Sequence, residues 1–475
     1  MQGAELTALP AREMVRLLAA GELSPLEAID AALARIEAVD WRVNAVPTLC
    51  PERARAAARR LMASEPPEDR RGWLAGLPVL VKDLTDVAGV RTTYGSPIFA
   101  DHLPARSDIL VERLEARGGI VLGKTNTPEF GAGANTFNEV FGATRNPWNT
   151  AMTCGGSSGG SAVALATGMA WLATGSDLGG SLRTPAAYCA VVGLRPSPGR
   201  VPHGPGPVPF DTLAVDGPMA RDLRDLALFL DAMAGRDRRD PLSYDPPATS
   251  YTDAVGWPAR PGRVAFSPDL GGITPVDPGI ARICAAAAGR FAELGATVEE
   301  AAPDLGEATA CFTTLRAALF VAGKAELLER HREALKPEVV WNIEHGLQLT
   351  AAEIGAAERA RGRLQQAAAA FFEDFDLLAC PAAIVPPFPV EIRYIEALGD
   401  HRFPSYVDWL AVTYAITLTG CPALSLPCGF TDNGLPVGLQ LVAPPRGEAA
   451  LLQAAVALED LLGLDTQRPI DPRPG

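Results

Sequence analysis

Residues 154–168 read CGGSSGGSAVALATG, a cluster of glycine and serine that runs directly into small apolar residues. A flexible linker would have polar, low-complexity sequence on both sides, so the apolar run argues against a linker. The run suits a buried helix or strand and is too short for a membrane span, which needs roughly 20 apolar residues. The cluster therefore belongs to the interior of a folded domain.

Helical and strand patterns alternate on both sides of this cluster. Residues 76–83 (GLPVLVKD) and 118–126 (GGIVLGKTN) predict buried strands. Helical patterns predict N-terminal helices over about 5–64 and a mostly helical side segment over about 280–375. Strands return with LLACP, ALSLPCG and LPVGLQLVAP, before a final helix at about 447–462. This alternation predicts an α/β fold with a covered interior sheet, and no repeat or linker divides residues 1–475, so we expect one domain.

Composition narrows the class of protein. The net charge of −14 comes without a Lys/Arg block, which argues against nucleic acid or an anionic membrane as a partner. Eight scattered cysteines form no CxxC pair, so we expect reduced thiols, no bound metal and a cytoplasmic location. The N-terminal segment carries charges through its apolar positions and reads as an amphipathic helix, not as a signal peptide.

The glycine-serine cluster allows two familiar interpretations. A phosphate loop would end in Gly-Lys-Ser/Thr, which is missing here. Residues 155–159 (GGSSG) match the GxSxG pattern of a serine hydrolase, which also needs an acid and a histidine. Four histidines follow the motif, but none has a recognisable catalytic context, and we interpret them as surface or packing residues: His203, His331, His345 and His401.

A second cluster, SDLGGS at 176–181, offers a different nucleophile. Consecutive glycines before Ser181 can turn backbone N–H groups toward one point, as an oxyanion requires. Lysine occurs at only four positions, 82, 124, 324 and 336, and one of these, Lys82, ends an apolar strand. Burial there can keep the amine neutral near pH 7, a shift of about 3 pKa units or about 4 kcal/mol, so that it could act as a base.

Several motifs together resemble the amidase signature family over nearly the whole chain. They are GLPVLVKD, GKTNTPEF, TRNPWN, GGSSGGSAVALATG, GSDLGGSLRTPAAYCAVVGLRP, GCPALSLPCGF and GLPVGLQLVAP. The resemblance implies a single α/β/α domain around a central mixed sheet. It also implies a Ser-cisSer-Lys triad made of Lys82, Ser157 and Ser181, with a cis peptide before Ser157. No cofactor or metal is implied.

The resemblance assigns further positions around this triad. Ser181 would be the nucleophile, Ser157 the proton relay and Lys82 the base. The N–H groups of Leu178, Gly179 and Gly180, together with that of Ser181, would hold the oxyanion. A loop that would border the acyl pocket comprises Gly131, Ala132 and Gly133. Lys124 is expected in a structural ion pair, Asp177 and Arg183 are expected to brace the loop, and Ser158 and Ser161 are interpreted as helix-capping or backbone-binding residues.

The substrate is less well defined by the sequence. The amidase component of the tRNA-dependent amidotransferase is expected to carry a Tyr-Asp-Gly segment with a nearby arginine, which is not evident here. We therefore favour a stand-alone hydrolase of aryl or alkyl amides, with carbamates and esters as further substrates. The partners would then be a small amide and water, and the protein a monomer or homodimer. Large residues could form a pocket wall or simply core: Trp341, Tyr406, Trp409 and Tyr414. The alternatives are a glutamine amidohydrolase subunit of that amidotransferase and a non-catalytic binding protein.

Overall fold

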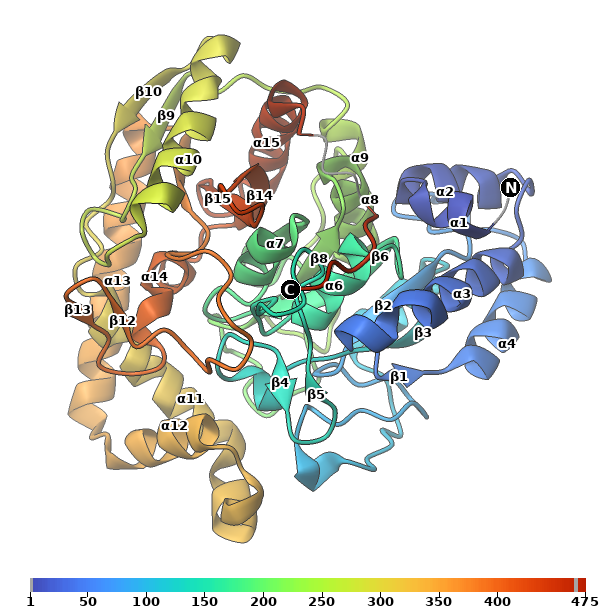
Figure 1. Ribbon diagram of the computed structural model, residues 1–475, viewed down its shortest axis with the longest axis horizontal. Helices are drawn as coiled ribbons and strands as arrows, with labels where there is room; N and C mark the ends of the chain where they lie inside the picture. The colour runs from blue at the N-terminus through green and yellow to red at the C-terminus, as the bar shows by residue number, and fades with distance from the viewer. Residues whose placement is uncertain (1–2, 465–468) are drawn as a thin grey trace.

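An eleven-stranded sheet forms the centre of the protein, in a computed structural model that describes residues 3–464 and 469–475 (Figure 1). The remaining positions of the expected domain, 1–2 and 465–468, lie outside the described residues. In spatial order the strands are β1 (Thr48–Leu49), β3 (Ile120–Thr125), β2 (Pro78–Lys82), β6 (Leu172–Asp177), β8 (Val215–Ala220), β7 (Val192–Arg195), β14 (Ala423–Phe430), β15 (Pro436–Val442), β11 (Leu377–Pro381), β9 (Arg263–Phe266) and β10 (Thr297–Glu300).

The sheet is mixed, as the family resemblance implied. Strands β3, β2 and β6 run parallel to one another. From β6 onward, each strand pairs antiparallel with its neighbour in the sheet, in the spatial order β6, β8, β7, β14, β15 and β11. The parallel register sets Lys82 opposite Thr125, and the antiparallel register of β6 and β8 sets Ser176 opposite Asp216. Two small hairpins lie outside the sheet, β4 (Phe137–Asn138) with β5 (Gly142–Ala143) and β12 (Ala397–Leu398) with β13 (His401–Arg402).

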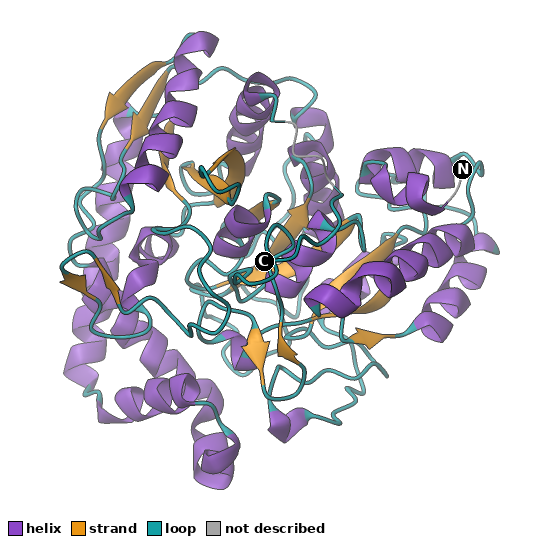
Figure 2. Ribbon diagram, in the orientation of Figure 1, coloured by secondary structure: helices purple, strands orange, loops and turns teal. Residues whose placement is uncertain are grey.

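Helices flank the sheet, and a group of long helices lies to one side of it (Figure 2). The α-helices are α1 (Gly3–Ala8), α2 (Ala11–Ala19), α3 (Pro25–Val43), α4 (Pro51–Met62), α5 (Ile109–Ala116), α6 (Gly159–Ala166), α7 (Arg183–Cys189), α8 (Leu223–Met233), α9 (Tyr251–Ala254), α10 (Pro278–Gly289), α11 (Ala308–His331), α12 (Pro337–Gln348), α13 (Ala351–Asp374), α14 (Ala411–Thr419) and α15 (Glu448–Leu462). Short 3-10 turns are η1 (Pro97–Phe99), η2 (Glu129–Gly131), η3 (Arg290–Leu294), η4 (Arg332–Ala334) and η5 (Asp408–Leu410).

Most local sequence signals agree with these elements. The capping box of Ser24 and Glu27 opens α3, and the apolar run of 76–83 becomes the fully buried strand β2. The mostly helical segment 280–375 holds α11, α12 and α13, but it also contains strand β10, which the helical interpretation missed. The same interpretation left out β9, so the outer edge of the sheet, where β9 and β10 pair, was not predicted.

The glycine-serine cluster opens a buried helix, α6. All eight residues of α6 are buried, and the glycines at its start let it approach other backbone segments closely. A Cβ built on Gly160 would lie 2.4 Å from the backbone nitrogen of Asn126, just beyond β3, and one on Gly159 would lie 2.2 Å from Thr136 Oγ1. Since real Cβ atoms need more than 3 Å, only glycine permits this packing, which fixes the serines before α6 against the end of β2.

Candidate active site

Lys82 is the last residue of β2, and its amine is fully enclosed. Its Nζ lies 2.6 Å from Ser157 Oγ and 2.9 Å from the Oγ atoms of both Ser158 and Ser176. Burial lowers the pKa of Lys82 to about 7, although the charges of Asp216 and Asp177 act in the opposite direction. A neutral amine has two hydrogens and one lone pair, so two of the three hydroxyls can accept from it while the third donates to it.

Ser157 lies between this amine and an adjoining loop. The peptide bond between Gly156 and Ser157 is cis, which confirms the conformation that the resemblance implied. On the side of the loop, a Cβ built on Gly131 would lie 3.3 Å from Ser157 Oγ. A larger residue at position 131 would therefore press on the hydroxyl closest to Lys82.

Ser181 follows β6 in the loop that leads into α7. Its carbonyl oxygen accepts a hydrogen bond of 3.1 Å from the N–H of Ser158, so the two serine clusters are joined through their backbones. The residue is only partly buried, unlike Ser157. Within residues 3–464 and 469–475 no hydrogen bond joins the hydroxyls of Ser157 and Ser181. The structure thus brings Lys82 and Ser157 into direct contact and puts Ser181 on the neighbouring, more open loop.

The backbone N–H groups before Ser181 differ in what they bind. The Gly180 N–H, which the resemblance places in the oxyanion hole, donates to Asp177 Oδ1 at 2.9 Å in this structure. Gly180 instead serves the turn, with a φ of +114° and so little space that a Cβ would lie 2.4 Å from Thr413 Oγ1. Among the described residues the N–H groups of Leu178, Gly179 and Ser181 have no hydrogen-bond acceptor, and these three remain available.

Asp177 and Arg183 brace this loop from below. Arg183 Nη2 donates to Asp177 Oδ1 at 2.8 Å, and both side chains are fully buried. Burial alone would raise the pKa of Asp177, but the charge and hydrogen bonds of Arg183 outweigh it and hold the pKa of this carboxyl below its usual range. Arg183 Nη1 also donates to the carbonyl oxygen of Thr413 and to Gln440 Oε1, which ties the loop to α14 and β15.

The loop of Gly131, Ala132 and Gly133 is held by the last of the four lysines. Lys336 Nζ donates to the Ala132 carbonyl oxygen at 2.6 Å, and a Cβ on Gly133 would lie 3.0 Å from the same nitrogen. The carbonyl of Ala132 is therefore turned toward a cation, while Gly131 faces Ser157. Lys124, by contrast, is buried in an ion pair of 3.1 Å with Asp83, as the sequence interpretation expected.

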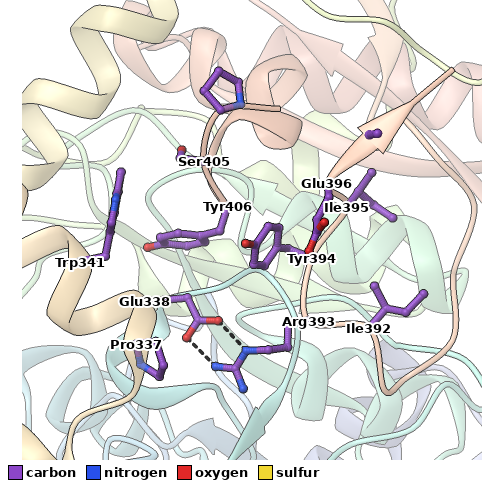
Figure 3. Close-up of a pocket in the computed structure, with 12 residues that line it drawn as sticks. Pro337, Glu338, Trp341, Ile392, Arg393, Tyr394, Ile395, Glu396, Ser405 and Tyr406 are labelled. Atoms are coloured by element: carbon purple, nitrogen blue, oxygen red, sulfur yellow. Dashed lines mark hydrogen bonds and ion pairs between the residues drawn. The ribbon is translucent and has the colours of Figure 1, made fainter. Parts of the chain in front are cut away.

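A hollow of about 800 Å³ is lined by Pro337, the residue after Lys336, and by residues of two other segments (Figure 3). Trp341 and Tyr406 form part of its wall, and Glu338 and Arg393 pair across it at 2.6 Å. The hollow does not include the three serines or Lys82. Between them lies Asn135, whose Nδ2 donates to the Arg393 carbonyl oxygen at 2.7 Å and whose backbone carbon would lie 3.0 Å from a Cβ built on Gly156, the residue before Ser157. Two other aromatic residues considered for a pocket wall, Trp409 and Tyr414, are instead buried in the core.

Two further serines contact Lys82. The sequence interpretation missed Ser176, and it gave Ser158 only a helix-capping or backbone-binding role, of which the backbone contact, to Ser176, is confirmed. Ser158 occupies the N-cap position of α6 but makes no side-chain cap, because its hydroxyl is turned to Lys82 instead. Ser176 reaches the same amine from β6, which pairs with β2. The register between β2 and β6 was the missing signal, since the sequence alone does not show which residues of two parallel strands are neighbours.

Membrane-spanning helices and clustered metal ligands are both absent from the described part of the chain. Of the helices within 3–464 and 469–475, none combines the length and the apolar character needed to cross a membrane. Over the same residues no three His, Cys, Asp or Glu side chains are grouped as metal ligands would be.

Comparisons with known proteins agree with this architecture. The family model described as Amidase matches residues 27–452. The chain is 36% identical to an acylamidase of Rhodococcus erythropolis, over 98% of this chain and 97% of the relative. It is 38% identical to one subunit of the glutamyl-tRNA(Gln) amidotransferase of Moorella thermoacetica, over 98% of this chain and 99% of the relative.

A solved structure extends the likeness to three dimensions. It is a bacterial aryl acylamidase belonging to the amidase signature enzymes, which superposes with a TM-score of 0.89 at 28% identity, over 98% of this chain and 97% of the other. The agreement thus covers the sequence, the mixed sheet and nearly the full length of both chains. The chain belongs to the amidase signature family and is a hydrolase of amide bonds.

Proposed function

We propose that this protein hydrolyses small aryl or alkyl amides through an acyl-enzyme on Ser181. The observation that carries the proposal is the 2.6 Å contact between Ser157 and the enclosed amine of Lys82. A lysine with a pKa of about 7 is neutral in a large fraction of molecules at neutral pH, so it can accept a proton. An arginine could not take this role, because its guanidinium stays protonated.

The reaction proceeds by a relay of protons. Ser157 transfers its proton to Lys82 Nζ and takes the proton of Ser181, while Ser181 Oγ attacks the amide carbon. The carbonyl oxygen gains negative charge and is stabilised by the unpaired N–H groups of Leu178, Gly179 and Ser181, which form the oxyanion hole.

The second half of the reaction reverses the relay. The leaving amine takes a proton from Ser157, which recovers one from the ammonium of Lys82. A water molecule then gives its proton to the same relay and attacks the acyl-enzyme, which releases the acid and restores Ser181. These steps require neither a cofactor nor a metal ion.

The hollow lined by Trp341 and Tyr406 is the proposed site for an apolar group of the substrate, because these side chains offer aromatic surface. Arg393 at its wall accepts a hydrogen bond from Asn135, whose backbone packs against Gly156, the residue before Ser157. The likeness to an acylamidase and to an aryl acylamidase supports the same substrate class. Carbamates and esters would follow the same acyl-enzyme chemistry. We further propose that residues 1–475 act as one domain, as a cytoplasmic monomer or homodimer that binds no nucleic acid and no membrane.

A fluorophosphonate probe tests the proposed nucleophile. It should modify the wild type at Ser181, as located by intact-mass analysis and peptide mapping, and the rate should fall sharply in Lys82→Ala. Ser181→Ala should lose both labelling and hydrolysis of an anilide such as p-nitroacetanilide. Ser64→Ala, which alters an exposed serine beyond α4, is the matched control and should behave as the wild type does. Labelling at Ser157 that is indifferent to Lys82 would overturn the proposal.

A second function is favoured by the 38% identity to the amidotransferase component of Moorella thermoacetica. In that case the substrate would be glutamine and the chain would act within a complex. Release of ammonia from glutamine, together with co-purification of partner subunits from the native host, would support this alternative. Anilide hydrolysis by the isolated chain without glutaminase activity would exclude it.

A further inference from the structure

A histidine and a buried aspartate form a pair at strand β8, which is separated from the strand of Lys82 by β6 alone. His203 Nδ1 lies 2.7 Å from Asp216 Oδ2. The Asp216 side chain is 4% exposed, whereas that of His203 is 54% exposed, so the pair spans from the interior to the surface. From the sequence, His203 was interpreted only as a surface or packing residue.

Sheet register connects this pair to the relay. Asp216 of β8 stands opposite Ser176 of β6, and residues directly opposite in antiparallel strands project from the same face with Cβ atoms about 4.5–5.5 Å apart. Ser176 Oγ accepts from Lys82 Nζ at 2.9 Å. The Asp216 carboxylate is therefore in the layer next to the amine, separated from it by about the width of one serine side chain.

The charges that act on Lys82 are those of two carboxylates. Asp216 has the larger effect on the pKa of Lys82 and Asp177 the smaller, and both favour the protonated amine. Asp177 is neutralised by Arg183 at 2.8 Å and approached by Arg195 at 3.5 Å. Asp216 has the half-exposed His203 as its partner, so its charge is compensated less completely.

Three carboxylates surround His203 and keep it charged. Besides Asp216, these are Asp240, which accepts from the backbone N–H of His203 at 2.9 Å, and Asp108 at the N-cap of α5. The charge of Asp216 is the largest cause that raises the pKa of His203, with smaller contributions from Asp108 and Asp240. Burial and the charge of Asp216 raise the pKa of Asp108 in turn. The raised pKa of His203 keeps its ring positively charged at neutral pH, whereas Asp108, with a pKa of about 7, changes its charge in this range.

We propose that the His203–Asp216 pair is a positioning element of the relay. The buried Asp216 carboxylate, placed opposite Ser176, favours the protonated form of the Lys82 amine that Ser176 contacts, and the histidine partly compensates that negative charge. The proposal rests on the proposed function, because it concerns the base of the same relay. The proposal also gives a reason for Asp216 in the buried strand β8, because a buried charge without a partner would be strongly unfavourable and this one is paired with His203.

The two members of the pair should act in opposite directions. Asp216→Asn removes negative charge beside the ammonium, so Lys82 should lose its proton more readily and the relay should work at lower pH. We expect the acidic limb to move down by about one to two pH units, as for a unit charge roughly 7 Å away at an effective dielectric constant of about 20. His203→Gln leaves the carboxylate less compensated, so the limb should move up, by about half a unit because solvent already screens the exposed ring.

The rate of Ser181 labelling by the fluorophosphonate probe, measured on the full chain from about pH 5.5 to about pH 9, gives the readout. Asp216→Glu keeps the charge and should retain the wild-type limb. Matched controls at exposed sites are Asp432→Asn and His331→Gln, which should leave the limb in place.

The outcomes separate this inference from the function on which it rests. Absence of labelling at Ser181 in the wild type would overturn the proposed function itself. With labelling intact, opposite shifts in Asp216→Asn and His203→Gln support the inference. A limb at the wild-type pH in either variant, or shifts in the same direction, overturns it. If Asp216→Asn does not fold, the direction of the His203→Gln shift decides alone.

Discussion

Replacing Lys82 with methionine should make the protein inactive and, at low pH, more stable. The amine has a pKa of about 7 in the folded protein and its usual 10.5 when exposed. Between these values the unfolded chain binds more protons than the folded one, so the free energy of unfolding of the wild type rises with pH. The full difference corresponds to about 5 kcal/mol, with a slope of at most about 1.4 kcal/mol per pH unit. Below pH 7 the wild type has gained none of this stability.

Methionine fills similar space without a proton to gain or lose, so Lys82→Met should not follow this rise. In urea unfolding, its advantage over the wild type should be largest near about pH 6 and should shrink by about 2–3 kcal/mol by about pH 9. Ser157→Ala is the matched control: it should lose hydrolysis by roughly 10³-fold or more, as Lys82→Met does, yet keep the wild-type slope. Parallel pH dependence of Lys82→Met and the wild type would refute the lowered pKa on which the relay depends.

Three further substitutions test the loop and the hollow. Asp177→Asn leaves Arg183 buried without its carboxylate, so the free energy of unfolding in urea should fall by about 3–5 kcal/mol. The control Glu307→Gln, in an exposed ion pair, should lose less than about 1 kcal/mol. Equal losses in the two variants would contradict a buried ion pair that braces the loop. Gly180→Ala forces a Cβ to within 2.4 Å of Thr413 Oγ1 and should lower both the melting temperature and the rate of Ser181 labelling. Trp341→Ala should raise KM for an anilide more than for a small aliphatic amide, and equal changes would count against the hollow as a substrate site.

The features of the fold that depend on the residues of a single segment were predictable from the sequence. The apolar run between Gly76 and Asp83 predicted a buried strand, and a lysine at the end of such a strand loses solvation. The apolar run after the glycine-serine cluster likewise predicted that the cluster lies in the interior, as the buried helix α6 does. These properties depend on the residues of one segment, so pattern and residue chemistry were sufficient.

Contacts that depend on register between distant segments were not predictable. Ser176 meets Lys82 across 94 positions of sequence, and His203 finds Asp216 only because β8 pairs with β6 in one particular register. The N–H of Gly180 looked available in sequence, but the neighbouring carboxylate of Asp177 takes it once the loop closes. Each of these outcomes is decided by tertiary geometry, which a linear pattern does not contain.

The two halves of the chain contribute opposite sides of the central sheet, so the proposed catalytic residues and the residues that line the hollow come from different halves. Strands β1, β2, β3, β6, β7 and β8 come from the first half of the chain and fill one side of the sheet, and β9, β10, β11, β14 and β15 fill the other (Figure 1). The residues of the proposed relay, Lys82, Ser157 and Ser181, all lie in the first half, whereas Trp341 and Tyr406 belong to the second. Recombination near residue 250 should therefore exchange the proposed substrate wall and leave the proposed relay unchanged, provided that the incoming half still presents Thr413 and Gln440 to the guanidinium of Arg183.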